Sequence, residues 1–460
     1  MGKSDLNCKS YKDPTARVVL ENDIYYRHIF ESFKSDYDFF INSGLYNKLV
    51  EKELLIQHKE VKTLYSQKFL YKKLLPDQIK FQSYPFEWSF EQWKKVLKTF
   101  LEINIISIHY GMILKDASPY NFYFKDGKSV LLDTSSFIQF NKNGDNWNAY
   151  LQFCEELLAP FALIRYCGQT WSKLLQAQIR GFSLNFASKQ LPFNSWFNLS
   201  CLLHIHLHTK FQYSKSNRTK LFKNNFTSEK LNVLLTQIYK DICSWETSKK
   251  GKNHWVNYYK NDIESKLYLS NKEKIVEQWL KKIKTEIVLD LGANDGRFSR
   301  IAAKYSKSVI AIESEPSCVD IIDNMICNEK LLNITALVTD LSTPSPALGV
   351  LNRELDSLID RLQVDMLFAL ALVHHLCISN YMSFEQVVEL FSELTTSYAI
   401  VEFIPIDDEK VQALMSAKRR TFVEYNEDEF LGKFLLKFEL LESITIESSK
   451  RKLFFFKKYS

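Results

Sequence analysis

Two acidic residues close to glycines are the strongest candidates for a ligand site in this chain. A run of apolar residues leads to Asp290, and the turn that follows contains Gly292 and Gly296, where the missing Cβ lets the backbone pass close beneath a ligand. A second apolar run, residues 308–312, ends directly before Glu313. A carboxylate at the end of a second parallel strand can accept hydrogen bonds from a ribose diol. The pattern therefore predicts a site for a ligand that contains a nucleoside.

The other residues of this turn separate two classes of ligand. A dinucleotide-binding turn, G-x-G-x-x-G, that starts at Gly292 needs glycine where this chain has Asn294 and Arg297. The Asp290 carboxylate would repel a pyrophosphate but suits a ligand with a sulfonium and an ammonium group, such as S-adenosylmethionine. A purely structural turn is the simpler alternative. The order of strand, turn and two acids favours the cofactor.

The segment also resembles motif I of class I S-adenosylmethionine-dependent methyltransferases, D/E-x-G-x-G-x-G, with Asn294 at the middle glycine. The resemblance covers residues from about 255 to 460. Within it, residues 343–349 and 370–375 resemble a narrower group of bacterial methyltransferases related to nodulation-associated proteins. It implies that Glu313 binds the ribose, that Asp340 ends the third strand near the adenine amino group, and that Ala369 lies in the fourth strand beside the methyl donor. The implied cofactor-binding residues are Asp290, Gly292, Asn294, Gly296, Glu313, Asp340 and Ala369.

Three further residues are candidates for chemistry at the methyl acceptor. His374 and His375 follow the fourth strand, and an imidazole titrates near neutral pH, which suits a general base. Glu402 ends the predicted fifth strand. The alternatives are ordinary: one of two adjacent histidines often faces the core or caps a helix, and a buried acid at a strand end often only binds loop amides.

A second constellation lies in the N-terminal half. Asp116 is followed five residues later by Asn121, and Asp133 closes a hairpin, an arrangement of base and two metal ligands that resembles the catalytic loop of kinases. Leu114 replaces the loop histidine, Thr134 and Ser135 replace Phe-Gly, and the chain has no glycine-rich lid upstream. We therefore expect a degenerate kinase-like fold that docks substrate or has a structural role, with phosphotransfer as the alternative.

The spacing of apolar residues along the chain predicts the helices and strands that position these residues. Beyond residue 284 strands and helices alternate, which predicts a C-terminal α/β, Rossmann-like methyltransferase domain with a mostly parallel seven-stranded sheet. We expect a kinase-like α+β region over 1–145, a helical region that completes the N-terminal domain over 146–250, and the methyltransferase domain over 251–460. The charged stretch 248–252 is the predicted linker, and a capping box of Ser89 and Gln92 predicts a helix to about Ile105.

Composition narrows the classes of function. The net charge of +6 is spread along the chain, so we expect no nucleic-acid partner. The 8 cysteines form no CxxC pair, and we expect no metal site, including at the alternating His204, His206 and His208. No secretory signal or membrane-spanning stretch is found, which predicts a cytoplasmic protein.

Together these patterns predict an enzyme that transfers a methyl group from S-adenosylmethionine to a small molecule, glycan or protein. A bifunctional kinase–methyltransferase that uses Asp116, Asn121 and Asp133 is one alternative. A non-catalytic binding protein that keeps the cofactor fold is the other.

Overall fold

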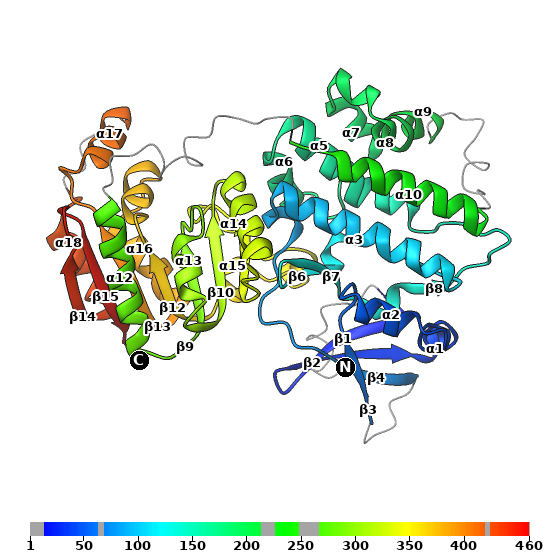
Figure 1. Cartoon of the computed structure of the whole chain (residues 1–460), viewed down its shortest axis with the longest axis horizontal. Coiled ribbons are helices and arrows are strands. Elements are labelled where there is room, and N and C mark those ends of the chain that lie inside the picture. The colour runs from blue at the N-terminus through cyan, green and yellow to red at the C-terminus, as the bar shows by residue number, and fades with distance from the viewer. Residues whose placement is uncertain (1–12, 63–68, 213–225, 248–265, 419–423, 460) are drawn as a thin grey trace. The chain divides into compact units, whose positions relative to one another are not determined.

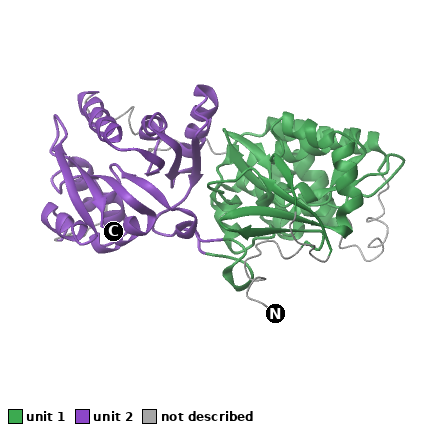
Figure 2. Cartoon of the chain, turned by 90° about the horizontal axis from the view of Figure 1, so that it is seen from below, with its two compact units in different colours: residues 1–250, 347–355 green, residues 251–346, 356–460 purple. Residues whose placement is uncertain are grey.

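The computed structural model describes residues 13–62, 69–212, 226–247, 266–418 and 424–459. The chain divides into two compact units (Figure 2): unit 1 comprises residues 1–250 and 347–355, and unit 2 comprises residues 251–346 and 356–460. Residues 347–355 lie within the range expected for the C-terminal domain but group with unit 1, where Leu348 and Leu355 pack against its hydrophobic core. The predicted linker 248–252 lies outside the described residues.

Unit 2 is built on a seven-stranded sheet of order β11-β10-β9-β12-β13-β15-β14 (Figure 1). The strands are β9 (Thr285–Leu291), β10 (Ser306–Glu313), β11 (Ile334–Val338), β12 (Val364–Ala369), β13 (Thr395–Phe403), β14 (Phe438–Thr445) and β15 (Lys452–Lys458). The first five are parallel, whereas β15 runs antiparallel to both β13 and β14. The predicted α/β class is confirmed. The sheet is mixed, because β15 is antiparallel to its two neighbours.

Helices cover both faces of this sheet, which is why its strands read as continuous apolar runs. Alternate side chains of β15 show the two layers. Phe455 stacks on Trp279 of α12 (Lys266–Lys282) with ring centroids 5.4 Å apart. Phe456 stacks at 5.0 Å on Phe434 of α18 (Glu427–Phe434), on the opposite face. The other helices of unit 2 are α13 (Arg297–Ala302), α14 (Pro316–Glu329), α15 (Leu358–Arg361), α16 (Phe384–Leu394) and α17 (Glu409–Lys418).

Unit 1 combines a four-stranded antiparallel sheet, of order β1-β2-β4-β3, with a larger helical part (Figure 1). The sheet strands are β1 (Ala16–Glu21), β2 (Ile24–Phe30), β3 (His58–Val61) and β4 (Leu70–Pro76), and α1 (Lys34–Asn42) and α2 (Leu45–Glu51) lie between β2 and β3 in the chain. The predicted helix after Ser89 is confirmed as α3 (Phe90–His109), and Ser89 and Gln92 form the capping box.

Short strands and helices complete unit 1. The predicted hairpin is confirmed as β6 (Phe122–Lys125) and β7 (Lys128–Leu131), and β5 (Met112–Leu114) pairs with β8 (Phe137–Gln139). The region after residue 146 is helical, from α4 (Tyr150–Gln152) and α5 (Ala159–Cys167) to α10 (Ser228–Ser244). Within the described ranges, no helix is both long and apolar enough to cross a bilayer.

Candidate functional site

The strand order of unit 2 defines where a ligand would bind. From β9 the chain moves outward to β10 and β11, and then returns to β12 on the other side of β9. Ligands of open α/β sheets bind outside the carboxyl ends of the strands at such a reversal. Here Leu291 of β9 pairs with Ala369 of β12, so the turn after β9 and the loop after β12 meet at this edge.

The turn after β9 depends on residues that tolerate a left-handed backbone. Gly292, Asn294 and Gly296 have φ angles of 71°, 49° and 79°. Asparagine is among the few residues that adopt this conformation readily, which explains why Asn294 can stand at the middle glycine. A Cβ atom on Gly292 would lie 3.2 Å from Leu372 Cδ1, and one on Gly296 would lie 3.0 Å from Met325 Cε. Backbone conformation therefore favours glycine at both positions, and an added Cβ would also require the Leu372 or Met325 side chain to shift by a few tenths of an ångström.

Glu313 ties this turn to the end of β10. Its Oε2 accepts a hydrogen bond from the Asn294 amide at 2.9 Å, and its Oε1 accepts from the Ser314 and Glu315 amides at 2.7 and 3.1 Å. A carboxylate offers about four lone pairs, so Oε2 keeps acceptor capacity beyond the Asn294 amide. Glu313 can thus brace the turn and still accept a hydroxyl from a ligand.

Asp290 lies deeper than the other candidates and is only 2% exposed. Its Oδ2 accepts a hydrogen bond from the Ser299 hydroxyl of α13 at 2.6 Å. Burial raises the pKa of Asp290 to about 6; the Ser299 hydrogen bond and the charge of Lys272 oppose the shift, and the negative charge of Glu313 adds to it. A carboxylate that is costly to ionise would gain from a cationic group brought to this edge of the sheet.

Asp340 follows β11 by two residues and is half-buried. Its Oδ1 accepts hydrogen bonds from the Ser342 amide at 2.9 Å and the Ser342 hydroxyl at 2.7 Å. These contacts fix the loop at the carboxyl end of β11, next to β10 and Glu313 in the sheet.

The two predicted acceptor histidines lie in the loop after β12, with ring centroids 4.1 Å apart. His374 is 1% exposed, and neither of its ring nitrogens has a hydrogen-bond partner among the described residues. Burial and then the charges of His375, Arg451, Lys410 and Lys272 hold the pKa of His374 well below its usual range, and burial and Lys410 lower the pKa of His375 to about 4. Both imidazoles are therefore neutral at neutral pH, with a nitrogen able to accept a proton.

Glu402 is contained in a buried polar network instead of an open cleft. Its Oε2 lies 2.6 Å from Lys272 Nζ, and its Oε1 accepts a hydrogen bond from the Tyr268 hydroxyl. Arg451 donates to the Tyr268 oxygen at 3.1 Å and forms a two-pronged pair with Asp408, at 2.8 and 3.2 Å. These contacts favour a positioning role for Glu402 over direct contact with an acceptor.

Sequence reasoning missed the basic members of this network. Lys272 lies in a lysine-rich helix and Arg451 in a turn before the last strand, and neither has a motif around it. Lys272 is 1% exposed and its ammonium lies 4.8 Å from the ring centroid of Phe298 in α13. The buried Lys272 ammonium therefore lies close both to α13, the first helix after the glycine turn, and to Glu402 near the end of β13.

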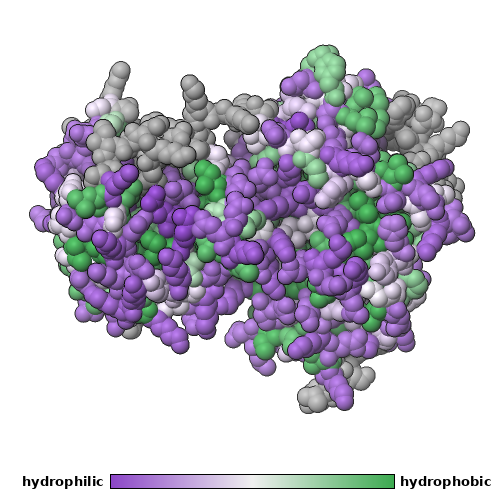
Figure 3. Space-filling view, viewed as in Figure 1, coloured by the Kyte–Doolittle hydropathy of each residue, from purple (hydrophilic) through white to green (hydrophobic). Residues whose placement is uncertain are grey.

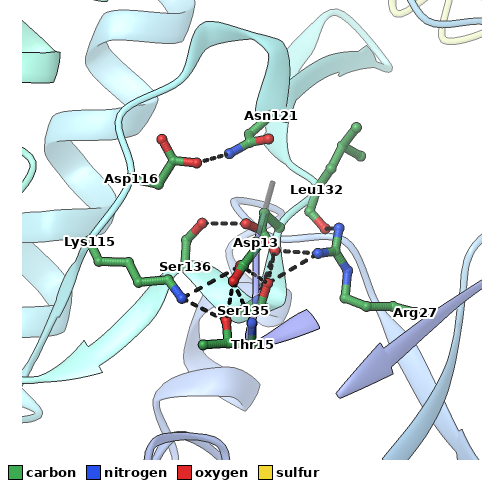
Figure 4. Close-up of polar contacts among 10 residues, drawn as sticks. Asp13, Thr15, Arg27, Lys115, Asp116, Asn121, Leu132, Ser135 and Ser136 are labelled. Carbon is green, nitrogen blue, oxygen red and sulfur yellow. Dashed lines mark hydrogen bonds and ion pairs between the residues drawn. The ribbon is translucent and has the colours of Figure 1, made fainter. Parts of the chain in front are cut away.

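Two members of the N-terminal constellation, Asp116 and Asn121, are in contact (Figure 4). Asp116 Oδ2 accepts a hydrogen bond from the Asn121 side chain at 2.9 Å, and its Oδ1 accepts from the Ser118 amide at 2.9 Å and the Gln152 side chain at 2.7 Å. Burial, and then the charge of Asp133, raises the pKa of Asp116.

Asp133 is neutralised by a residue that the sequence did not single out. Arg27 of β2 forms a short ion pair with the Asp133 carboxylate and donates to the Leu132 carbonyl at 3.3 Å. The Ser135 and Ser136 hydroxyls both donate to Asp133, at 2.6 Å. Burial alone would raise the pKa of Asp133, but Arg27 and these hydrogen bonds outweigh burial and lower it. The carboxylate thus already has a cation.

The alternating histidines lie in a π-helix, Leu202–Leu207, and its continuation. His204 bonds to the Tyr150 hydroxyl at 2.7 Å, and His206 lies between the Ser188 and Ser195 hydroxyls at 2.8 and 2.9 Å. Across the part of the chain that the structure describes, no group of three or more His, Cys, Asp or Glu residues is arranged to hold a metal ion.

Comparison with known proteins gives one relative that matches most of the chain and others that match parts of it. No protein-family model matches. The chain is 27% identical over 383 residues to nodulation protein NoeA of Rhizobium meliloti, which covers 82% of this chain and 80% of that protein. It is 36% identical over 101 residues to a "Probable ribosomal RNA small subunit methyltransferase A" of Methanosphaera stadtmanae, 22% of this chain and 34% of the relative.

Similar solved structures include N-methyltransferase NodS from Bradyrhizobium japonicum, at 11% identity and a TM-score of 0.33, which covers 43% of this chain and 100% of NodS. Magnesium protoporphyrin IX methyltransferase from Synechocystis matches at 14% identity and a TM-score of 0.30, over 43% of this chain and 88% of that one. Neither compact unit contains 383 residues, so the chain resembles NoeA across residues of both units.

Proposed function

We propose that this chain is an S-adenosylmethionine-dependent methyltransferase whose cofactor binds in unit 2. The observation that carries the proposal is the left-handed turn of Gly292, Asn294 and Gly296, braced by Glu313 at the topological switch of the sheet. The methyltransferases named among the relatives and similar structures agree with this assignment.

The residues present fit this cofactor better than a dinucleotide. The turn is a cradle that a Cβ on Gly292 would narrow, and two carboxylates, Asp290 and Glu313, lie around it. Two negative charges disfavour a pyrophosphate and favour a ligand with positive charge. Glu313 would accept hydrogen bonds from the ribose, Asp340 would face the adenine amino group, and Asp290 would stabilise the cationic end.

The cofactor, when bound, supplies a methyl group that is already activated on sulfur. The protein must therefore align the acceptor and remove a proton where the acceptor carries one. His374 and His375 follow β12 at the same edge, and both are neutral, so either could take that proton. Their low pKa values keep both imidazoles unprotonated at neutral pH, so that they can accept a proton as weak bases. Glu402 would act through Lys272 and Tyr268 as a positioning residue.

The acceptor class stays open among small molecules, glycans and proteins. We propose that unit 1 supports the enzyme without transferring phosphate, because Arg27 already supplies a positive charge to Asp133 where a magnesium ion would have to bind. The arrangement of turn, Glu313 and unpartnered His374 argues against a purely non-catalytic scaffold.

Calorimetric titration with S-adenosylmethionine and its demethylated product tests the proposal. We expect binding and a raised melting temperature, because the ligand stabilises only the folded state. Gly292→Val should abolish the response, whereas Gly44→Val is the matched control, because Gly44 also has a left-handed φ, 83°, and a Cβ at that position meets nothing within 4 Å. No thermal or calorimetric response of the wild-type chain to either ligand would refute the cofactor assignment.

A further inference from the structure

The helical part of unit 1 has an unusual distribution of charge. In the sequence, no Asp or Glu occurs between Leu157 and Ser228, whereas the same span contains nine Lys and Arg residues, five of which lie among the described residues. The chain as a whole carries 60 basic and 54 acidic residues, so the rest of the sequence is nearly balanced. This region therefore carries a local excess of positive charge, so the net charge is less evenly spread than we expected from the whole-chain count.

Large apolar side chains are exposed in the same region. Phe193 and Phe197 are 75% and 80% exposed, and their rings pack edge to face at 5.5 Å. Phe186, Leu199 and Leu203 are exposed to between 42% and 45%. We call these five residues the aromatic tip. Figure 3 shows apolar side chains gathered at this end of unit 1, near α7 (Leu184–Gln190) and α8 (Leu199–Cys201). An apolar group of this kind marks a surface for interaction.

A buried histidine holds the aromatic tip in place. His206 is 0% exposed, and its two ring nitrogens bond to Ser188 of α7 and to Ser195 of the 3-10 helix Phe193–Phe197. Trp196 stacks on the His206 ring at 4.2 Å. The exposed phenyl rings are thus presented by a fixed backbone, and their exposure is not an effect of a loose loop.

Exposed cations flank the aromatic tip. Lys189 lies in the last turn of α7, four residues before the 3-10 helix Phe193–Phe197, and the Lys210 ammonium lies 4.8 Å from the ring centroid of Trp196. Aromatic and aliphatic side chains beside lysines are the composition that surface-bound proteins present to a lipid interface.

We propose that the aromatic tip binds the surface of a membrane that contains anionic lipids. The phenyl and leucine side chains enter the boundary between headgroups and acyl chains, while Lys189 and Lys210 remain at the level of the phosphate groups. A nucleic acid fits this surface less well, because leucine side chains do not stack on bases as aromatic rings do. The proposal concerns unit 1 alone and does not depend on the cofactor of unit 2.

Co-sedimentation of the full chain with vesicles tests the proposal. We expect binding to vesicles of phosphatidylcholine and phosphatidylserine, and much weaker binding to phosphatidylcholine alone. Phe193→Ser/Phe197→Ser should weaken binding by about tenfold or more through lost apolar insertion. Lys189→Gln/Lys210→Gln should weaken it by at least about fivefold, the effect of one basic residue near an anionic surface.

Matched controls come from the same unit. Phe69 is 66% exposed away from the tip, and Lys240 is an exposed lysine of α10, so Phe69→Ser and Lys240→Gln should bind vesicles like the wild type. All variants should keep the wild-type melting temperature, because they alter exposed side chains.

Three results would overturn the proposal. The first is no binding of the wild-type chain to anionic vesicles, and the second is equal loss of binding in the tip variants and their controls. The third is a chain that does not bind vesicles but uses Phe193 and Phe197 to bind a single-stranded RNA oligonucleotide or to form a dimer. This result would assign the aromatic tip to a different partner.

Discussion

The ammonium group of Lys272 lies 2.6 Å from the Glu402 carboxylate, and both side chains are almost completely excluded from solvent, at 2% and 0% exposure. Lys272 comes from α12, which precedes the sheet, and Glu402 comes from the end of β13. The pair therefore ties the helix that precedes the glycine turn to the strand beside the predicted acceptor site.

Replacing Lys272 should destabilise the protein strongly. Lys272→Met leaves the Glu402 carboxylate buried without its cation, which typically costs about 3–5 kcal/mol of unfolding free energy. Lys282→Met is the control, because Lys282 lies on the same helix as Lys272 but is 56% exposed and pairs with Glu442 of β14, and such surface pairs contribute about 0–1 kcal/mol. Denaturant unfolding measures both. Lys272→Met/Glu402→Gln should recover part of the loss, and equal effects of Lys272→Met and Lys282→Met would contradict the prediction.

The raised pKa of Asp290 predicts that stability depends on pH. The folded state holds the Asp290 proton up to about pH 6, while the unfolded state releases it near its ordinary value of 3.8. Between these values the folded state binds more protons, so unfolding free energy should fall as pH rises, by at most about 1.4 kcal/mol per pH unit. Asp290→Asn removes this group and should become more stable relative to wild type as pH rises from 4 to 6. A difference in unfolding free energy between the two proteins that stays constant from pH 4 to 6 would refute this prediction.

Glu313 should contribute to cofactor affinity more than to folding. Glu313→Ala removes the acceptor of a ribose hydroxyl, which should weaken cofactor binding by about 1.5–3 kcal/mol, the value of a hydrogen bond to a charged group. Glu329→Ala, at the exposed end of α14, is the control and should bind like wild type. Calorimetric titration distinguishes them, and unchanged affinity in Glu313→Ala would move the ribose site elsewhere.

The Arg27–Asp133 pair predicts weak or absent binding of Mg-ATP to unit 1. Binding of magnesium at Asp133 would require the Arg27 guanidinium to leave, and the two serine hydroxyls compete for the same oxygens. Asp133→Asn should leave methyl transfer within about threefold of wild type, a barrier change below roughly 1 kcal/mol. The test is to titrate Mg-ATP into the wild-type and Asp133→Asn proteins and, once an acceptor is identified, to measure the rate of methyl transfer by both. Tight, magnesium-dependent ATP binding that Asp133→Asn loses would instead support the bifunctional kinase–methyltransferase.

Local patterns predicted the central part of unit 2. Its strands are buried on both faces, so they appear as continuous apolar runs, and Gly292, Gly296 and Glu313 follow them at fixed spacing. The backbone conformation at Asn294 is also a local property, because asparagine tolerates the left-handed region that a middle glycine would otherwise occupy. The hairpin before Asp133 and the capped helix after Ser89 were predictable for the same reason.

Only tertiary structure decided which charged groups meet. Lys272 and Lys282 lie on one lysine-rich helix, yet the Lys272 side chain is 2% exposed while the Lys282 side chain is 56% exposed. The partners of Lys272 and of Arg27 come from distant parts of the chain, Glu402 and Asp133. Sequence periodicity indicates which face of its own helix or strand a residue occupies. An ion pair between two elements depends instead on how those elements pack against each other. The amino-acid sequence alone therefore determined the glycine turn and its acids, and packing decided the buried charges around them.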